Sequence, residues 1–164
     1  MTTGIVKTQG TELFTVDALS SSVAAVLKIA CPTGITGLGG AADQIETTCL
    51  DATVDREYAR GLGNPGQVSV PFNFIPTNSS HQFLNDLKDA GDVVEWMICL
   101  SDGTADPVLN SADELVAPAG RTSAKFNAYI ADLNFDIATN EIVRGTMTLQ
   151  RSGTVTWAYN APAP

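Results

Sequence analysis

The stretch that decides the fold reads QVSVPFNFI at residues 67–75, where apolar and polar side chains alternate. Its apolar side chains, from Val68 to Phe74, share one face of an extended chain, and Ser69 and Asn73 share the other. Successive side chains of a strand point to opposite faces, so this alternation predicts a strand with one face in a core and one polar face.

Most of the remaining chain has a similar pattern. Strands are predicted at residues 11–16, 25–31, 44–50, 93–100, 124–137 and 142–159, each rich in Val, Ile, Thr or aromatic residues. The apolar face shifts by one residue near Ala131, which predicts either a β-bulge or two strands joined at a kink. Glycine-rich turns at 34–40 and 61–66 separate strands, and the Asp102-Gly103 pair predicts a tight hairpin turn.

One helix is predicted, at about residues 79–90. Its apolar positions are Phe83, Leu84 and Leu87. Asn78 precedes the helix as an N-cap candidate, and Gly91 follows it as a stop signal. A single amphipathic helix in a strand-rich chain packs its apolar stripe on a sheet. The predicted fold is therefore mainly β, or β-rich α+β: a β-sandwich or barrel with one flanking helix.

Charge is low in density and acidic in balance. The chain has 164 residues, 16% of them charged, and a net charge of −9. That length is typical of one domain of ~100 to 200 residues. Residues 43–114 carry most of the acids, 13 against three bases. The balance argues against a protein that reads nucleic acid sequence, because neutralising phosphates requires Lys and Arg.

Cysteine usage and hydropathy bear on where the protein is made. Cys31, Cys49 and Cys99 are odd in number and far apart, and we expect buried free thiols. No apolar run approaches the ~18 to 20 residues of a membrane span, and the first residues lack the core of a signal peptide. We therefore expect no membrane segment and a protein made in a cytoplasm.

Patterns that carry catalysis or metal binding are missing from the sequence. His81 is the one histidine, and we expect an exposed polar side chain there, in the first turn of the predicted helix. One histidine and three dispersed cysteines do not make a zinc site. Residues 34–40 contain no Lys after their glycines and open no helix, unlike a phosphate-binding loop. The prediction is a structural protein that is not an enzyme and has no cofactor or metal.

A second reading comes from the aromatic residues. A carbohydrate-binding or adhesin-like β-sandwich would present exposed aromatic side chains as stacking platforms. The candidates for that role are Trp96, Tyr129, Trp157 and Tyr159.

Several ordered segments resemble the tail tube, or major tail, proteins of long-tailed bacteriophages, the lambda-like tubes of siphophages. They are ETTCLD at 46–51, DREYARGL at 55–62, GQVSVPFN at 66–73 and ICLSDGT at 98–104. The resemblance implies hexameric rings that stack into a hollow tube, through which phage DNA passes during ejection without specific binding. It also implies assembly in the host cytoplasm, a final place in the virion tail, and contacts with tape measure, tail tip or initiator, and tail terminator proteins.

The resemblance also assigns parts of a single tail tube domain spanning residues 1–164. A loop at about 51–67 would reach the next ring, although an ordinary mobile loop is the alternative. Its contact residues would be Asp55, Arg56, Glu57, Tyr58, Arg60 and Leu62. A second long loop is expected at about 105–120, with a turn at 111–115. Mobile ends are expected at about 1–8 and 160–164.

An acidic or neutral polar lining would let DNA slide through such a tube, because each Lys or Arg paired with phosphate would slow it. Acids on or beside predicted strands are the candidates for the lumen. They are Glu46, Asp92, Glu95, Asp132 and Asp136.

Overall fold

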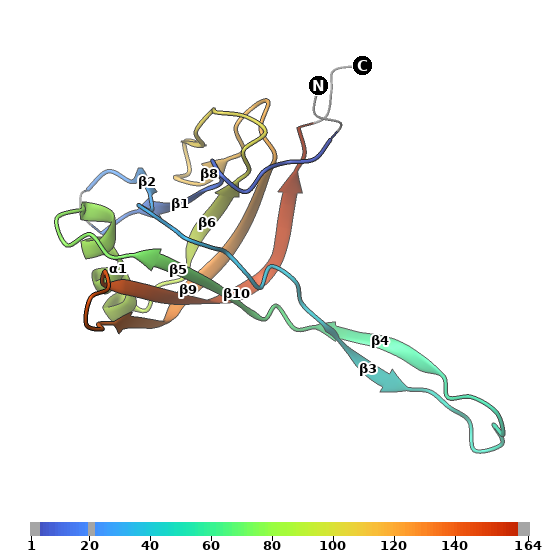
Figure 1. Cartoon of the computed structure of the whole chain (residues 1–164). Coiled ribbons are helices and arrows are strands. Elements are labelled where there is room, and N and C mark those ends of the chain that lie inside the picture. Colours follow the sequence, from blue (N-terminus) through green and yellow to red (C-terminus); the bar gives the residue numbers. More distant parts are fainter. Residues whose placement is uncertain (1–3, 20–21, 161–164) are drawn as a thin grey trace.

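The computed structural model describes residues 4–19 and 22–160. Within these ranges one helix and ten strands form (Figure 1). The strands are β1 (Glu12–Asp17), β2 (Ala25–Lys28), β3 (Ala42–Glu46), β4 (Tyr58–Gly63), β5 (Gln67–Asn73), β6 (Val94–Cys99), β7 (Val108–Leu109), β8 (Leu115–Val116), β9 (Ser123–Asp136) and β10 (Arg144–Ala158). The helix is α1 (Ser79–Ala90). The mainly β fold with a single flanking helix is confirmed.

The main sheet has six antiparallel strands in the order β2-β1-β6-β9-β10-β5. The chain that leaves β2 runs on to the other edge, where Thr36 exchanges two backbone hydrogen bonds with Ser69 of β5, at 3.0 and 2.9 Å. One continuous segment, residues 25–36, therefore bonds β1 with its first half and β5 with its second, and closes the sheet into a barrel.

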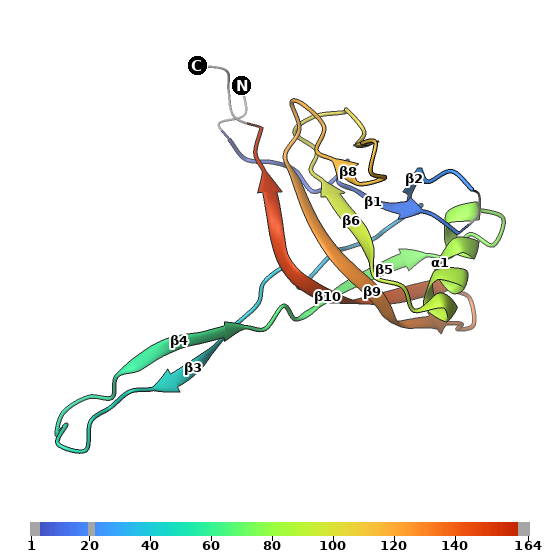
Figure 2. The same cartoon turned by 180° about the vertical axis from the view of Figure 1, so that it is seen from behind.

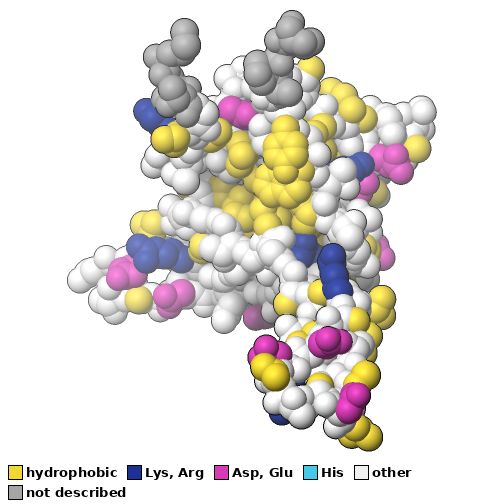
Figure 3. Space-filling model, turned by 90° about the vertical axis from the view of Figure 1, so that its right-hand side faces the viewer, with side chains coloured by type: hydrophobic (Ala, Val, Ile, Leu, Met, Phe, Trp, Pro, Cys, Tyr) yellow, Lys and Arg dark blue, Asp and Glu magenta, His cyan; other side chains and the backbone are white. Residues whose placement is uncertain are grey.

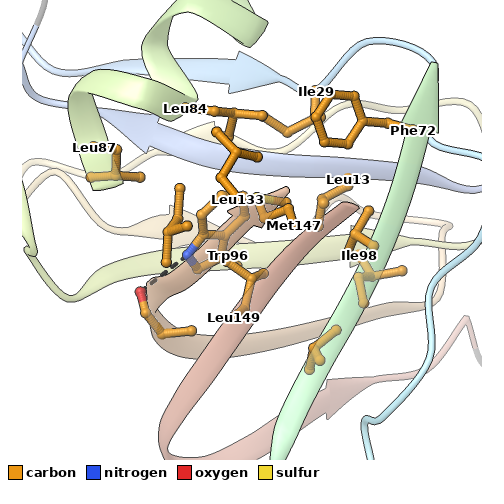
Figure 4. Close-up of a cluster of buried hydrophobic side chains, with 14 of the residues drawn as sticks. Leu13, Ile29, Phe72, Leu84, Leu87, Trp96, Ile98, Leu133, Met147 and Leu149 are labelled. Carbon is orange, nitrogen blue, oxygen red and sulfur yellow. Dashed lines mark hydrogen bonds between the residues drawn. The ribbon is translucent and has the colours of Figure 1, made fainter. Parts of the chain in front are cut away.

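Side chains from all around this barrel meet in one core, drawn in Figure 4. Val68, Val70 and Phe72 of β5 point into it, as the alternation in the opening stretch predicts. Trp96 lies fully buried at its centre, and its indole N–H donates to the carbonyl of Ala128 at 3.1 Å. A buried indole needs such a partner, because an unpaired donor would cost free energy on folding.

Helix α1 begins and ends where the sequence predicts. The Asn78 side chain accepts from the backbone N–H of Ser80 at 2.9 Å, and Gly91 ends the helix in the left-handed conformation at φ 70°. The apolar side chains Phe83, Leu84 and Leu87 are buried in the barrel core. The helix thus covers one end of the barrel (Figures 1 and 2).

The phase shift near Ala131 is a β-bulge. In the β9–β10 pairing Leu149 lies opposite Ile130, and Thr148 lies opposite Asp132, so Ala131 has no partner in the ladder. The strand stays continuous from Ser123 to Asp136. Of the two readings left open by the sequence, the bulge is correct.

His81 is not exposed, and the prediction for it was wrong. Its ring is 1% exposed, packed at 4.8 Å from Phe72 and 5.8 Å from Phe74 between ring centroids. Nδ1 accepts from the backbone N–H of Ile75 at 2.9 Å, and Nε2 donates to the carbonyl of Ala30 at 2.8 Å. His81 lies three residues before Leu84 and thus on the buried face of the helix, where it joins three segments.

The prediction for the cysteines was right for one of three. Cys99 is buried on β6, and burial raises the pKa of its thiol to about 11. Cys31 and Cys49 are exposed, since they fall where the chain runs outside the barrel core. Free thiols at all three positions agree with the sequence.

The Asp102-Gly103 pair does not connect two adjacent strands in a tight hairpin. The Asp102 carboxylate accepts from the backbone N–H and hydroxyl of Thr122, at 2.9 and 2.5 Å. These bonds join two positions that are 20 residues apart, at the two ends of the segment between β6 and β9. Desolvation alone would raise the pKa of Asp102, but these hydrogen bonds outweigh it and hold the pKa below its usual value. Gly103 is needed because a Cβ there would lie 2.4 Å from the Gly120 carbonyl oxygen.

Within that segment, the predicted loop at 105–120 contains the short strands β7 and β8. The predicted turn between them is present, since the Asn110 side chain accepts from the backbone N–H groups of Ala112 and Glu114. At the ends of the chain, residues 1–3 and 161–164 of the predicted mobile termini lie outside the described residues. Asn160 donates its backbone N–H to the hydroxyl of Thr122 at 3.0 Å.

Candidate assembly surfaces

A two-stranded β-hairpin, made of β3 and β4 and here called the hairpin arm (residues 41–64), projects from the barrel (Figures 1 and 2). Its base is held by the backbone N–H of Asn64, which donates to the carbonyl of Ala41 at 2.7 Å. Near its end, Thr47 donates to the carbonyl of Glu57 at 2.9 Å. Almost all side chains of both strands are exposed. An isolated two-stranded hairpin is only marginally stable in water, which makes this exposed arm a candidate assembly surface.

The arm corrects the prediction of a loop at 51–67. Residues 58–63 form strand β4, which pairs with β3, and the loop itself is the shorter segment from 47 to 57. The six predicted contact residues divide between these parts. Asp55, Arg56 and Glu57 lie in the loop, and Tyr58, Arg60 and Leu62 lie on β4.

Of the second three, the structure brings Tyr58 and Arg60 together. Tyr58 and Arg60 are two residues apart along β4 and share one face of the strand. A β-bulge follows, since Ala42 pairs with Gly63 and Gln44 with Arg60, and so the alternation does not extend to Leu62. Tyr58 is 52% and Leu62 is 85% exposed. Arg56 instead turns to Glu46 of β3, with 3.9 Å between Nε and the carboxylate oxygen. This face of β4 thus presents an aromatic and a cationic side chain, both of types enriched at the centres of protein interfaces.

Sequence reasoning missed further apolar residues of the arm. Ile45, Leu50 and Val54 are 55%, 108% and 88% exposed. Leu50 and Val54 lie in the loop at the end of the arm, farthest from the barrel core. In the sequence, Leu50 and Val54 stand out only as aliphatic residues inside a polar loop. Single exposed aliphatic residues are common on protein surfaces, so this pattern does not by itself predict a contact.

A second candidate surface is the outer face of β5, β10 and β9, opposite the core. In the strand register Thr148 lies between Ser69 and Asp132, and Gln150 lies between Gln67 and Tyr129. Most side chains on this face are polar, from Asn127 on β9 to Asn73 on β5, and Pro71 opposite Thr146 is an apolar member. An antiparallel sheet with one polar face is suited to contact with water.

The five acids predicted for a lumen do not gather at one place. Asp132 and Asp136 lie on β9, where they face Thr148 and Arg144 in the register, and Asp132 is 4.0 Å from the Lys88 ammonium. Glu46 lies on the hairpin arm, and Asp92 is exposed in the turn after α1.

The fifth acid, Glu95, has a structural partner on each side. One carboxylate oxygen is 3.2 Å from the Lys125 ammonium, and the other accepts from the backbone N–H of Leu115 at 2.6 Å. These contacts attach β8 to the barrel and occupy the carboxylate.

The four aromatic side chains suggested for sugar stacking do not share one surface, although Trp157 and Tyr159 are 41% and 74% exposed. Trp96 is buried in the core. Trp157 and Tyr159 stack on each other, with ring centroids 6.0 Å apart and an angle of 7° between planes. Tyr129 is 37% exposed on the polar sheet face.

Within residues 4–19 and 22–160, no three His, Cys, Asp or Glu side chains come together as metal ligands would. Over the same ranges, the one helix is too short and too polar to cross a membrane.

Comparison with known proteins gives a family and a fold. The sequence profile of the family described as "Phage tail tube, TTP, lambda-like" matches residues 4–161. The chain is 37% identical over 153 residues to "Structural protein 3" of Pseudomonas phage PAJU2, with 91% of each chain covered.

Solved structures agree in fold. The tail tube of SPP1 superimposes with a TM-score of 0.61 at 14% identity, over 93% of this chain and 78% of that one. The sheath/tube terminator structure of an extracellular contractile injection system, PVC in its extended state, gives a TM-score of 0.67 at 14% identity, over 97% and 100% of the two chains. At such identities these likenesses show a shared fold.

Proposed function

The chain belongs to the lambda-like family of phage tail tube proteins, and we propose that its copies form hexameric rings that stack into a hollow tube for phage DNA. Its role as a structural protein of the phage tail, and so as a component of the virion, follows from that membership. The ring number, the stacking contacts and the passage of DNA are the content of the proposal.

The observation that carries the proposal is the hairpin arm. It extends away from the barrel and exposes apolar side chains on strand and loop. Exposed apolar groups on an element that cannot support itself mark a surface that another molecule covers. In a stack of identical subunits that molecule is a copy of this chain in the next ring. The face formed by Tyr58 and Arg60, with the exposed Leu62 beside it, is the proposed contact.

The polar sheet face of β5, β10 and β9 is the proposed lining of the lumen. It offers amides, hydroxyls and the carboxylates of Asp132 and Asp136, with the side chain of Arg144 at one end. Such a face hydrates DNA phosphates without neutralising them, so the polyanion is not retained. Glu46, Asp92 and Glu95 lie off this face, and we assign them no role at the lumen.

Further partners follow from a tube of this kind. A tape measure protein would occupy the lumen during assembly, with a tip or initiator complex at one end and a terminator at the other. Assembly would take place in the host cytoplasm, and no catalytic step is part of the proposed role.

Substituting both Tyr58 and Arg60 with alanine is expected to abolish tubes while the barrel stays folded. The two side chains are exposed on the arm, so their loss removes contact area between copies and leaves the core untouched. Negative-stain electron microscopy of concentrated protein counts tubes and rings, and circular dichroism checks the fold.

The matched control is Asn85→Ala with Asp89→Ala, two exposed positions on α1 far from the arm. This variant is expected to form tubes as the unmodified protein does. Normal tubes from the Tyr58 and Arg60 variant would remove the arm from the stacking contact. If the unmodified protein stays monomeric even with its initiator proteins, the proposed tube itself fails.

A further inference from the structure

The hairpin arm is joined to the barrel by two short legs, an entering leg at residues 37–40 and a leaving leg at residues 64–66. Both legs contain glycine, at Gly37, Gly39, Gly40 and Gly66. Glycine leaves the backbone freer than any other residue, so legs of this composition do not fix a direction by themselves. The arm nevertheless leaves the barrel along one line, seen edge-on towards the viewer in Figure 3 and from the side in Figures 1 and 2. The contacts that hold this direction must come from another element.

The entering leg is held by Arg151 of β10. One terminal nitrogen of its guanidinium donates to the carbonyl of Gly39. Among the described residues, this is the one hydrogen bond that residues 37–40 make. Gly40 lies against the same group, since a Cβ there would be 3.1 Å from a terminal nitrogen of Arg151. The guanidinium therefore contacts two successive residues of the entering leg.

The leaving leg is held by the same part of β10. The Gln150 side chain donates to the carbonyl of Gly66 at 3.1 Å, and the backbone N–H of Arg151 donates to the same carbonyl at 3.3 Å. Successive side chains of a strand point to opposite faces. Gln150 thus reaches the leaving leg from the polar face of the sheet, and Arg151 reaches the entering leg from the core face.

The stability of the barrel does not explain an arginine at this position. Arg151 follows Met147 and Leu149 on the core face of β10 and is 6% exposed. Its Nε is buried and has no hydrogen-bond partner among the described residues. Desolvation lowers the pKa of the guanidinium, and no described carboxylate offsets this effect. A buried charge without an opposite charge costs free energy, and an apolar side chain of similar length would avoid that cost.

We propose that Arg151, assisted by Gln150, is a positioning residue that sets the direction of the hairpin arm in the free chain. The inference rests on the proposed stacking, for which it supplies the orientation of the arm. An element that is already held in its bound orientation loses less conformational freedom on assembly than a hinged one, and this favours association.

The distance between arm and barrel in the free chain tests the proposal. One nitroxide label is attached at Ala59→Cys on β4 and the other at Asp89→Cys on the exposed face of α1. Cys31→Ser and Cys49→Ser remove the exposed native thiols, and the remaining cysteine is buried on β6. Double electron–electron resonance, below the protein concentration that gives tubes, measures the distribution of distances between the labels. We expect a narrow distribution with Arg151 present and one at least about twofold broader for Arg151→Met, as for a glycine-rich linker.

Three further variants separate the hydrogen bond from charge and packing. Arg151→Lys keeps a donor for the Gly39 carbonyl and is expected to give a width between those of the unmodified protein and Arg151→Met. Gln150→Ala is expected to broaden the distribution less than Arg151→Met, because the backbone N–H of residue 151 still holds Gly66. Lys88→Met removes a positive charge from α1 and is the matched control, with no change in width expected.

Equal widths for Arg151→Met and Lys88→Met would overturn the proposal, and so would a broad distribution in the protein with Arg151 intact. A urea midpoint that falls for Arg151→Met and not for Lys88→Met would also overturn it, because the side chain would then serve the core.

Tube formation shows whether the fixed direction matters for stacking. Arg151→Met is expected to raise the protein concentration needed for tubes at least about fivefold, whereas Lys88→Met leaves it unchanged. An unchanged concentration for Arg151→Met would overturn the link between arm direction and stacking. Absence of any tube from the unmodified protein would overturn the stacking alone, because the distances are measured in the free chain.

Discussion

Replacing Arg121 with alanine is expected to lower the free energy of unfolding by about 3 to 5 kcal/mol, the usual cost of breaking a buried charged network. The side chain is 1% exposed and joins parts of the chain far apart in sequence. Its nitrogens donate to the carbonyls of Leu100 at 2.6 Å, Ala105 at 3.0 Å and Gly10 at 3.0 Å. The Glu12 carboxylate lies 2.9 Å away and balances the charge. Alanine would leave these acceptors buried without a donor.

Urea unfolding followed by tryptophan fluorescence, to which buried Trp96 and half-exposed Trp157 contribute, measures the loss. Arg56→Ala, at a side chain that is 71% exposed, is the control and is expected to change stability by less than about 1 kcal/mol. Arg121→Lys keeps the charge but loses the planar guanidinium group with its several N–H donors, and we expect an intermediate loss of stability. A change below about 1 kcal/mol for Arg121→Ala would contradict the role given to this side chain.

Substituting Gly37 with alanine is the second large effect expected. Gly37 has φ +96°, and a Cβ there would lie 2.0 Å from the carbonyl oxygen of Gln67. The clash is with backbone of β5 at the point where residues 31–36 close the barrel, so no side chain can move to relieve it. Backbone strain and overpacking cost about 1 to 3 kcal/mol each, and we expect a total loss of about 3 kcal/mol or more.

Gly39→Ala is the matched control two residues away. Gly39 has no positive φ, and a Cβ there meets nothing within 4 Å. Alanine at such a site is expected to be neutral, or to stabilise by up to about 1 kcal/mol through the unfolded state. Urea unfolding measures the stability of both variants, and the rate of proteolytic cleavage at the base of the arm measures local opening there. Equal stability of the two would show that the close approach of the chain to β5 is not required.

The parts of the fold that the sequence predicts well depend on local rules. The alternation at 67–75, the caps at Asn78 and Gly91 and the phase shift at Ala131 each act within a few residues, and all three are confirmed. Strand β4 was missed because its sequence, YARGLG, buries neither face and contains two glycines. A strand without a buried face has no alternation to detect.

The parts that failed depend on contacts distant in the sequence. His81 is buried because residues 30 and 75 close over the first turn of α1, and its spacing from Leu84 was the available signal. Arg121 and Arg151 are buried because the barrel closes around them. The barrel is formed by strands far apart in the sequence, so no short stretch of sequence predicts this burial. The contact residues on β4 came from a family resemblance, whereas the exposure of Leu50 is seen only in three dimensions.

Cryo-electron microscopy of tubes assembled from the purified protein tests the central claim most directly. We expect six copies in each ring, the arm of each copy against the next ring, and the polar face of β5, β10 and β9 towards a hollow lumen. A tube with that sheet face turned to the outside, or with no continuous channel along its axis, would contradict it.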